Sequence, residues 1–308
     1  MSTTMSVIRV YRYGGPEELK LEQQPRPEPQ EGEVLLRVQA AGVNPLEWKI
    51  RQGLAKDFMP VTFPYTPGDD VAGIIEGLGP GVTSFEVGQA VLGRGNGTYA
   101  EYITAPAEAF VLKPAALSFA EAASIPVGVT TAWRGLFDEG ELEAGQRVLI
   151  QGAAGGVGLF AVQLAKWKGA YVIGTASTAN LEFVRSLGAD EVVDYTTTPV
   201  ESVVKDVDLV LEGVGERTMR SSLATLKPGG KLSSLAALPP LEQAQARGIQ
   251  AKMIAAHPSR SILQAAVQLI EEWRLKVSVG KTFPLAEARQ AHEYSQRGHG
   301  RGRVVLLV

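Results

Sequence analysis

A cluster of glycines between an apolar segment and a helical segment is the feature that most limits how this chain can fold. Residues 147–151 are expected to form a buried strand and residues 156–168 an amphipathic helix. The turn between them contains Gly152, Gly155 and Gly156, and Gly158 follows. Glycines let a backbone approach a pyrophosphate without a Cβ clash, and a helix N-terminus presents free N–H groups to it. The segment therefore predicts a dinucleotide-binding turn, with a ligand-free tight turn as the alternative.

Strand and helix patterns alternate on both sides of this turn. Strands are expected at residues 147–151, 170–175, 191–195, 208–212, 231–235 and 250–255, and helices at 156–168, 179–187, 216–226 and 241–247. Six strands with helical crossovers predict a doubly wound parallel six-stranded sheet. The first 115 residues instead hold short strands between Gly and Pro, which is typical of a compact β-barrel. The fold class is therefore α/β, a β-barrel domain plus a parallel sheet.

The last part of the chain has no place in a six-stranded sheet that is already complete. It contains two expected helices, 259–273 and 285–297, and an apolar strand at 304–308. We therefore expect this segment to return to the first domain.

The composition excludes several kinds of chemistry. The chain of 308 residues has no cysteine, and its three histidines are His257, His292 and His299. Disulfides, thiolate zinc sites and a cysteine nucleophile are therefore impossible. The net charge of −3 without a basic block argues against nucleic acid as a partner. No segment has the pattern of a signal peptide or a membrane span, so a cytoplasmic protein is expected.

The cofactor can be predicted from the end of the second strand of the sheet. An enzyme that uses NAD usually has an acidic residue there, which binds the ribose 2′-hydroxyl. This strand instead ends at residues 173–178, where no Asp or Glu occurs. NADPH is favoured, because its 2′-phosphate meets no acid there and the hydroxyls of Ser177 and Thr178 are able to bond it. A helix N-cap is the alternative role for these two residues.

Motifs along nearly the whole chain resemble the zinc-free quinone oxidoreductase branch of the medium-chain dehydrogenase/reductase superfamily. They are Ala40-Ala41-Gly42-Val43-Asn44-Pro45, Pro67-Gly68-Asp69-Asp70-Val71-Ala72-Gly73, Thr131-Ala132-Trp133, Ala153-Ala154-Gly155-Gly156-Val157-Gly158, Leu187-Gly188-Ala189-Asp190, Leu226-Lys227-Pro228-Gly229-Gly230 and Gly298-His299-Gly300-Arg301-Gly302-Arg303. The resemblance implies a GroES-like domain of residues 1–118 and 260–308 and a Rossmann NADP(H)-binding domain of residues 119–259. It also implies that the nicotinamide lies in a cleft between the two.

The resemblance also implies that no metal is bound. Zinc-dependent relatives have a cysteine thiolate where this chain has Asn44 and an imidazole where it has Asp69. Without a Lewis acid, alcohol oxidation loses the group that stabilises an alkoxide. The expected reaction is therefore hydride transfer from NADPH to an acceptor that is already electrophilic, a quinone or an α,β-unsaturated carbonyl compound.

Site residues follow from the same resemblance. Asn44 and Thr131 are the candidate catalytic residues, and both are expected at the nicotinamide end of the cofactor. A turn before Pro45 and packing inside a helix are their respective structural alternatives. The other cofactor-binding candidates are Ala154, Gly155, Gly156 and Val157 at the pyrophosphate, Ser177 and Tyr195 near the 2′-phosphate, and Gly213, Val214, Ser234 and Leu235 at the ends of two later strands. Arg297 and Arg301 are candidate cations for the 2′-phosphate.

Two other functions stay open at this point. One is a catalytically weak NADPH-binding protein with a sensory or structural role. The other is an enoyl-thioester reductase, which also transfers a hydride to a conjugated carbonyl. A homodimer joined through the edge strand at residues 250–255 is expected by resemblance, because an unpaired strand edge seeks a partner.

Overall fold

The computed structural model describes residues 3–255, 257, 259–298 and 300–308. The chain forms two compact units. Unit 1 comprises Met1–Val127, Pro258–Val267 and Val277–Val308, and unit 2 comprises Gly128–His257 and Gln268–Lys276. Each unit has its own sheet and its own buried core.

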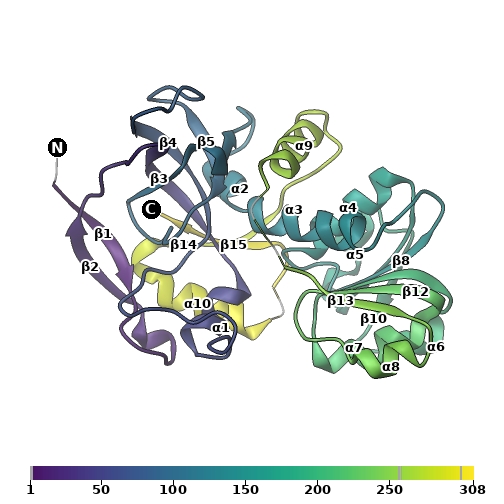
Figure 1. Ribbon diagram of the computed structural model, residues 1–308. Helices are drawn as coiled ribbons and strands as arrows, with labels where there is room; N and C mark the ends of the chain where they lie inside the picture. Colours follow the sequence, from purple (N-terminus) through teal and green to yellow (C-terminus); the bar gives the residue numbers. More distant parts are fainter. Residues whose placement is uncertain (1–2, 256, 258, 299) are drawn as a thin grey trace. The chain divides into compact units, whose positions relative to one another are not determined.

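Unit 2 contains a six-stranded parallel sheet, as the sequence predicts (Figure 1). Its strands are β8 (Arg147–Gln151), β9 (Tyr171–Ala176), β10 (Glu191–Asp194), β11 (Val207–Glu212), β12 (Leu226–Ser234) and β13 (Gln250–Met253). Their order is β10-β9-β8-β11-β12-β13. The chain therefore reverses its direction of travel across the sheet between β8 and β11, which is the switch point where such sheets bind ligands.

Helices cover both faces of the unit 2 sheet (Figure 1). They are α4 (Gly158–Lys168), α5 (Leu181–Ser186), α6 (Val200–Val203), α7 (Glu216–Thr225) and α8 (Leu241–Gln245), with the short 3₁₀ helix η4 (Thr178–Asn180) before α5. The buried face between α7 and the sheet includes Val210, Met219 and Leu223, each at most 5% exposed. These apolar residues recur at strand and helix spacing, which is why the local pattern predicts the elements correctly.

Unit 1 contains the mainly antiparallel sheet that the sequence predicts for a barrel-like domain. The main path is β14-β15-β3-β4-β5-β7, with β6 paired to β3, and β1 and β2 form a separate pair. The strands are β1 (Thr4–Arg9), β2 (Lys20–Pro25), β3 (Glu33–Val43), β4 (Asp70–Leu78), β5 (Ala90–Arg94), β6 (Tyr102–Pro106), β7 (Phe110–Leu112), β14 (Val279–Pro284) and β15 (Arg303–Leu307).

The remaining helices lie in unit 1 and in the segments that connect the two units. They are α1 (Pro45–Arg51), α2 (Phe119–Ala123), α3 (Pro126–Trp133), α9 (Arg260–Glu271) and α10 (Ala288–Arg297), with 3₁₀ helices η1 (Pro16–Glu18), η2 (Ala107–Ala109) and η5 (Leu285–Glu287) and a π-helical turn, η3 (Arg134–Asp138), after α3. Strand β15 pairs with β3, with Val304 opposite Val43. This pairing confirms that the C-terminal segment returns to the first domain.

The unit boundaries differ from the domain bounds expected from sequence, for two local reasons. Helix α2 packs on β3 and β4, so unit 1 extends to Val127. The segment Gln268–Lys276 belongs to unit 2, because the Gln163 side chain holds Lys276 at both backbone groups. Gln163 Nε2 donates to Lys276 O at 3.0 Å, and Lys276 N donates to Gln163 Oε1 at 2.7 Å.

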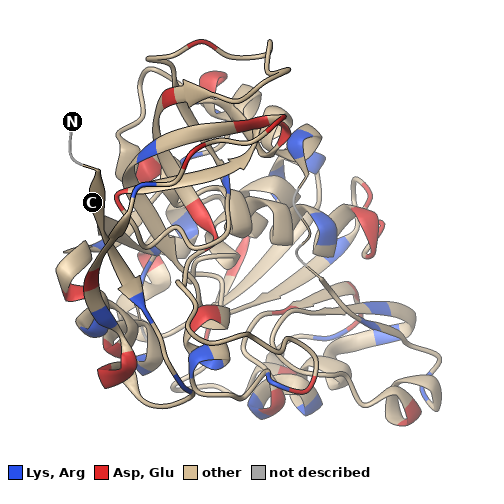
Figure 2. Cartoon of the chain, turned by 60° about the vertical axis from the view of Figure 1, so that its left-hand side comes forward, with Lys and Arg blue, Asp and Glu red and all other residues tan. Residues whose placement is uncertain are grey.

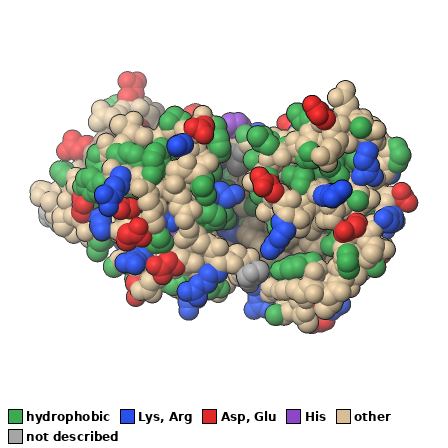
Figure 3. Space-filling model, turned by 90° about the horizontal axis from the view of Figure 1, so that it is seen from below, with side chains coloured by type: hydrophobic (Ala, Val, Ile, Leu, Met, Phe, Trp, Pro, Cys, Tyr) green, Lys and Arg blue, Asp and Glu red, His purple; other side chains and the backbone are tan. Residues whose placement is uncertain are grey.

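Charges of both signs are interspersed over the elements of each unit (Figure 2). The face shown in Figure 3 likewise mixes Lys and Arg with Asp and Glu and with apolar side chains. Among the residues that the structure describes, no helix combines the length and the hydrophobicity that a membrane span requires.

Candidate functional site

The glycine turn of unit 2 connects β8 to α4 at the switch point of the sheet. Gly152 adopts a φ of +70°, and its N–H donates to Thr175 Oγ1 at 3.0 Å. A Cβ on Gly158 would lie 2.3 Å from the carbonyl oxygen of Gly152, so this position requires glycine. Val157, the N-cap residue of α4, provides no side-chain cap. The N–H groups of Leu159 and Phe160 donate instead to the backbone carbonyl oxygens of Gly155 and Val157, at 3.0 and 3.1 Å, so the start of α4 is capped by the turn itself.

The predicted pyrophosphate residues all lie in this turn. Ala154 is buried, and Gly155, Gly156 and Val157 are half-buried. The turn thus brings together four neighbours in sequence, with backbone groups that are partly accessible. They are neighbours in sequence because a strand, a glycine turn and a helix follow one another directly.

The other predicted turns follow strands at the same edge of the sheet. Glu212, the last residue of β11, lies in register with Gln151 on one side and with Ser234 on the other. Gly213 and Val214 come directly after β11, and Leu235 comes directly after β12. The N–H of Leu235 donates to Glu212 O at 2.9 Å. Because carboxyl ends of parallel strands meet at one edge, the structure brings these predicted residues near the glycine turn.

Thr131 lies in α3 and is 6% exposed. Its Oγ1 atom is buried, and it has no hydrogen-bond partner among the described residues; the same holds for Thr130. A π-helical turn, η3, follows directly and is of a kind that often occurs at functional sites. An unpaired buried hydroxyl is a group that a polar ligand atom would satisfy.

The predicted 2′-phosphate residues lie at the ends of β9 and β10. Ser177 Oγ accepts a hydrogen bond of 3.2 Å from Asn180 Nδ2, and Tyr195 is 40% exposed. Thr178 Oγ1 donates to Asp194 Oδ2. The hydroxyls of Thr178 and Thr196 lower the pKa of Asp194, which is therefore a carboxylate at neutral pH.

Asp194 is the acid that sequence inspection missed. The sequence shows no Asp or Glu at the end of β9, but Asp194 pairs in parallel register with Ala176 of that strand. In the sequence, Asp194 stands only as the next-to-last residue of the following predicted strand, 191–195. The two candidate cations, Arg297 and Arg301, belong to unit 1.

Asn44 lies at the N-cap position of α1 in unit 1 and is 4% exposed. Its Nδ2 atom donates to Glu47 Oε1 and to Asp70 Oδ2, both at 3.1 Å. Its Oδ1 atom accepts from Arg303 Nη2 at 2.8 Å. Both amide protons are therefore used within unit 1, and the second lone pair of Oδ1 is the capacity that remains for a ligand.

A buried network surrounds Asn44. Arg303 forms an ion pair with Asp70, and the two side chains are 3% and 0% exposed. Burial raises the pKa of Asp70 to about 6, while Arg303 acts in the opposite direction. Burial also raises the pKa of Glu47 to about 8, although Tyr99 donates a hydrogen bond of 2.6 Å to its carboxyl group. Burial thus favours the protonated form of Glu47, against the hydrogen bonds that Asn44 and Tyr99 donate to it.

His292 and Asp69 of unit 1 each have a polar partner. The Tyr99 hydroxyl also contacts His292 Nε2 at 3.2 Å, and burial lowers the pKa of His292 to about 3, so this histidine is neutral. Asp69 forms an ion pair with Arg94. In the described part of the chain, no three His, Asp or Glu side chains are grouped as metal ligands. His299 lies outside the described residues.

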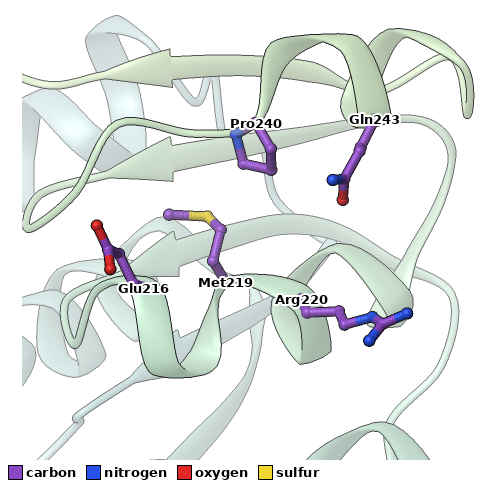
Figure 4. Close-up of a pocket in the computed structure, with 5 residues that line it drawn as sticks. All are labelled: Glu216, Met219, Arg220, Pro240 and Gln243. Atoms are coloured by element: carbon purple, nitrogen blue, oxygen red, sulfur yellow. The ribbon is translucent and has the colours of Figure 1, made fainter.

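Unit 2 also has a pocket between α7 and α8 (Figure 4). It is lined by Glu216, Met219, Arg220, Pro240 and Gln243. None of these is a predicted site residue, although Glu216 directly follows the turn at residues 213–215.

Two family models match the chain. One, described as an alcohol dehydrogenase GroES-like domain, covers residues 30–115, and one described as a zinc-binding dehydrogenase covers residues 187–306. The chain is 36% identical to the quinone oxidoreductase of Mus musculus, over 99% of this chain and 98% of that protein.

Solved structures match over the same length. A mycobacterial protein complexed with NADPH has a TM-score of 0.91 at 32% identity, covering 99% of this chain and 100% of that one. The CurK enoyl reductase also has a TM-score of 0.91, at 29% identity and 99% coverage of both chains.

Proposed function

The chain belongs to the quinone oxidoreductase branch of the medium-chain dehydrogenase/reductase superfamily, and from that premise we propose that it is an NADPH-dependent oxidoreductase that works without zinc. The proposed acceptors are quinones and α,β-unsaturated carbonyl compounds. The observation that carries the proposal is the glycine turn at the switch point, where Gly158 leaves room for close backbone approach and α4 begins without a side-chain cap.

The residues of unit 2 fit a nicotinamide dinucleotide. Residues 154–157 would line the pyrophosphate, with the N–H of Gly155 kept within the turn by its 3.0 Å hydrogen bond to Gly152 O, and Ser177 and Tyr195 would hold the adenosine end. The turns at residues 213–214 and 234–235 would line the nicotinamide half, and the unpaired hydroxyl of Thr131 would bond to it. When bound, the nicotinamide supplies the hydride.

The proposal of a zinc-independent reaction rests on the donor atoms in unit 1. At the positions where zinc-dependent relatives have ligands, Asn44 offers a neutral amide and Asp69 is paired with Arg94. Both amide protons of Asn44 are bonded to Glu47 and Asp70, and its oxygen to Arg303. Because an amide is a poor zinc ligand, the acceptor must already be electrophilic. Activity that survives exhaustive chelation supports this part, and activity that is lost on chelation and restored by zinc contradicts it.

The preference for NADPH rests on the acid-free end of β9 and is supported by similarity to a mycobacterial protein solved with NADPH. The Asp194 carboxylate acts in the opposite direction, because it would repel a 2′-phosphate bound beside Thr178. Titration of the purified protein with NADPH and with NADH, followed by cofactor fluorescence, tests the preference. Tighter or equal binding of NADH would overturn it.

The acceptor is tested by steady-state assays with NADPH. We expect turnover with a panel of 1,4-quinones or of 2-alkenals. An enoyl thioester is the second candidate acceptor, because the fold closely matches that of the CurK enoyl reductase. Turnover of crotonyl thioesters alone would favour that candidate, whereas tight NADPH binding without turnover of any acceptor would favour a sensory or structural protein.

A cytoplasmic homodimer completes the proposal. Strand β13 is an edge of the unit 2 sheet, and its last residue, Met253, is 45% exposed. A second copy is able to pair with this edge and to cover its apolar side chain. Light scattering coupled to gel filtration measures the mass in solution, and a monomer at micromolar concentration would contradict the dimer.

A further inference from the structure

A chain of buried hydrogen bonds runs beneath the carboxyl edge of the unit 2 sheet. It starts at Gly152, whose N–H donates to Thr175 Oγ1 at 3.0 Å. The Thr175 hydroxyl donates to Gln151 Oε1 at 2.8 Å, and Gln151 Nε2 donates to Ser222 Oγ at 3.1 Å. The Ser222 hydroxyl then donates to Glu212 Oε2. The four side chains come from β9, β8, α7 and β11, and none is more than 3% exposed.

Glu212 connects this chain of hydrogen bonds to the turn at residues 213–215. Its Oε1 atom accepts from the N–H of Val214 at 2.8 Å and from the N–H of Gly215 at 3.0 Å. It also accepts from the hydroxyl of Thr218 at 2.8 Å. The turn at residues 213–215 is thus folded around the carboxyl group of Glu212, and Gly215 adopts a φ of +112° there.

The hydrogen bonds all run in one direction. Each donor points along the chain toward Glu212, which accepts at both oxygens. A hydroxyl has a single proton, so Thr175, which donates to Gln151, is an acceptor for Gly152. Reversing the Gln151 amide would break two bonds at once. A directed chain of this kind has one arrangement, and its members strengthen one another.

Pairing of the strands does not need these side chains. The backbone register already joins β8 to β9 and to β11, and apolar residues pack the interior well without buried polar groups. The chain of hydrogen bonds instead orders the backbone at its two ends. It holds one N–H of the glycine turn and two N–H groups of the 213–215 turn in place.

We propose that Gln151, Thr175, Ser222 and Glu212 are positioning residues that hold these two turns in one fixed relation before the dinucleotide binds. The inference rests on the proposed function, because the two turns are the proposed pyrophosphate and nicotinamide contacts. A site that is already ordered binds its ligand more tightly, since less conformational freedom is lost on binding. Breaking the chain at either end therefore weakens cofactor binding, although no member needs to touch the cofactor.

Isosteric variants test this directly. Thr175→Val removes the hydroxyl and keeps the shape, and Ser222→Ala removes the middle link; each should weaken NADPH binding by about tenfold. The double variant should bind NADPH about as weakly as the weaker-binding single variant. The two effects should not add, because either substitution alone already interrupts the same chain of hydrogen bonds. Thr175→Ser keeps the hydroxyl and should remain within about twofold of the parent. In each case KM for NADPH should rise while kcat changes little.

Thr225→Val is the matched control. Thr225 is fully buried in α7, and its hydroxyl donates to the backbone carbonyl oxygen of Ser222 at 2.8 Å, so it takes no part in the side-chain hydrogen bonds that link the two turns. This variant should lose thermal stability comparably to Thr175→Val and should keep the parent affinity for NADPH. If it binds NADPH as weakly as Thr175→Val does, general destabilisation explains the effect and the inference is overturned.

Hydrogen exchange without cofactor gives a second measurement. In Thr175→Val, the amides of Val214 and Gly215 should exchange faster, although the hydrogen bonds of the Thr175 side chain are to Gly152 and Gln151. Parent-like exchange at residues 213–215 together with parent-like NADPH affinity overturns the inference. If the parent protein binds no dinucleotide, the proposed function fails instead, and the exchange experiment still decides whether the chain couples the turns.

Discussion

Replacing Glu47 by Gln should remove a pH dependence of stability that the buried network of unit 1 imposes. Glu47 is 7% exposed, and burial raises the pKa of its carboxyl group from the ordinary 4.5 to about 8. The folded state therefore binds a proton more tightly than the unfolded state does. The resulting stabilisation is complete below about pH 4.5 and is lost as the pH rises through about 8.

The expected magnitude follows from these two pKa values. Between pH 6 and pH 8 the unfolded state carries almost no proton on this group, whereas the folded state goes from nearly full to half occupancy. Integration over this interval gives a loss of about 2 kcal/mol in the free energy of unfolding. Glu47→Gln cannot titrate, so its profile should be flatter than that of the parent by this amount.

Urea unfolding at pH 6, 7 and 8, followed by circular dichroism, measures the difference between the two profiles. The variant should be less stable at every pH, because an NH₂ donor replaces one of two accepting oxygens: Oε1 accepts from Asn44 Nδ2 at 3.1 Å, and Oε2 accepts from the Asn44 N–H at 2.8 Å. The test is therefore how steeply the free energy of unfolding changes with pH, and not its absolute value. Glu121→Gln, which alters the exposed capping box of α2, is the matched control and should follow the parent profile. Parallel profiles for Glu47→Gln and the parent would refute the reasoning.

Three other substitutions test separate parts of the structure. Arg303→Met leaves the Asp70 carboxylate buried without its cation and should lower the free energy of unfolding by about 3–5 kcal/mol, whereas adding Asp70→Asn should restore much of it; urea titration decides. Gly158→Ala places a Cβ 2.3 Å from the carbonyl oxygen of Gly152 and should weaken NADPH binding by more than about tenfold. Parent-like affinity in a fluorescence titration would contradict the proposed role of the glycine turn in binding the cofactor. Asp194→Asn removes a negative charge beside Thr178 and should tighten NADPH roughly threefold without changing NADH, so equal effects on both cofactors would exclude a contact with the 2′-phosphate.

The helices and strands of unit 2 and the position of the glycine turn follow from local sequence patterns. The strand, turn and helix at residues 147–168 are consecutive, and their spacing of apolar residues and glycines depends only on local backbone geometry. The parallel sheet followed from repeated strand and helix patterns for the same reason. The family motifs also placed the C-terminal strand in the first domain, which the pairing of β15 with β3 confirms.

The pairing of the buried polar side chains depends on contacts between distant segments, which local patterns do not contain. Asn44, Asp70 and Arg303 are far apart in sequence, and their mutual hydrogen bonds depend on the register of β3, β4 and β15. Asp194 similarly reaches Thr178 because β10 pairs with β9. Sequence patterns report which side of an element is apolar, but a buried polar group must find its partner wherever the fold removes both from water. That partner is therefore set by the packing of distant segments.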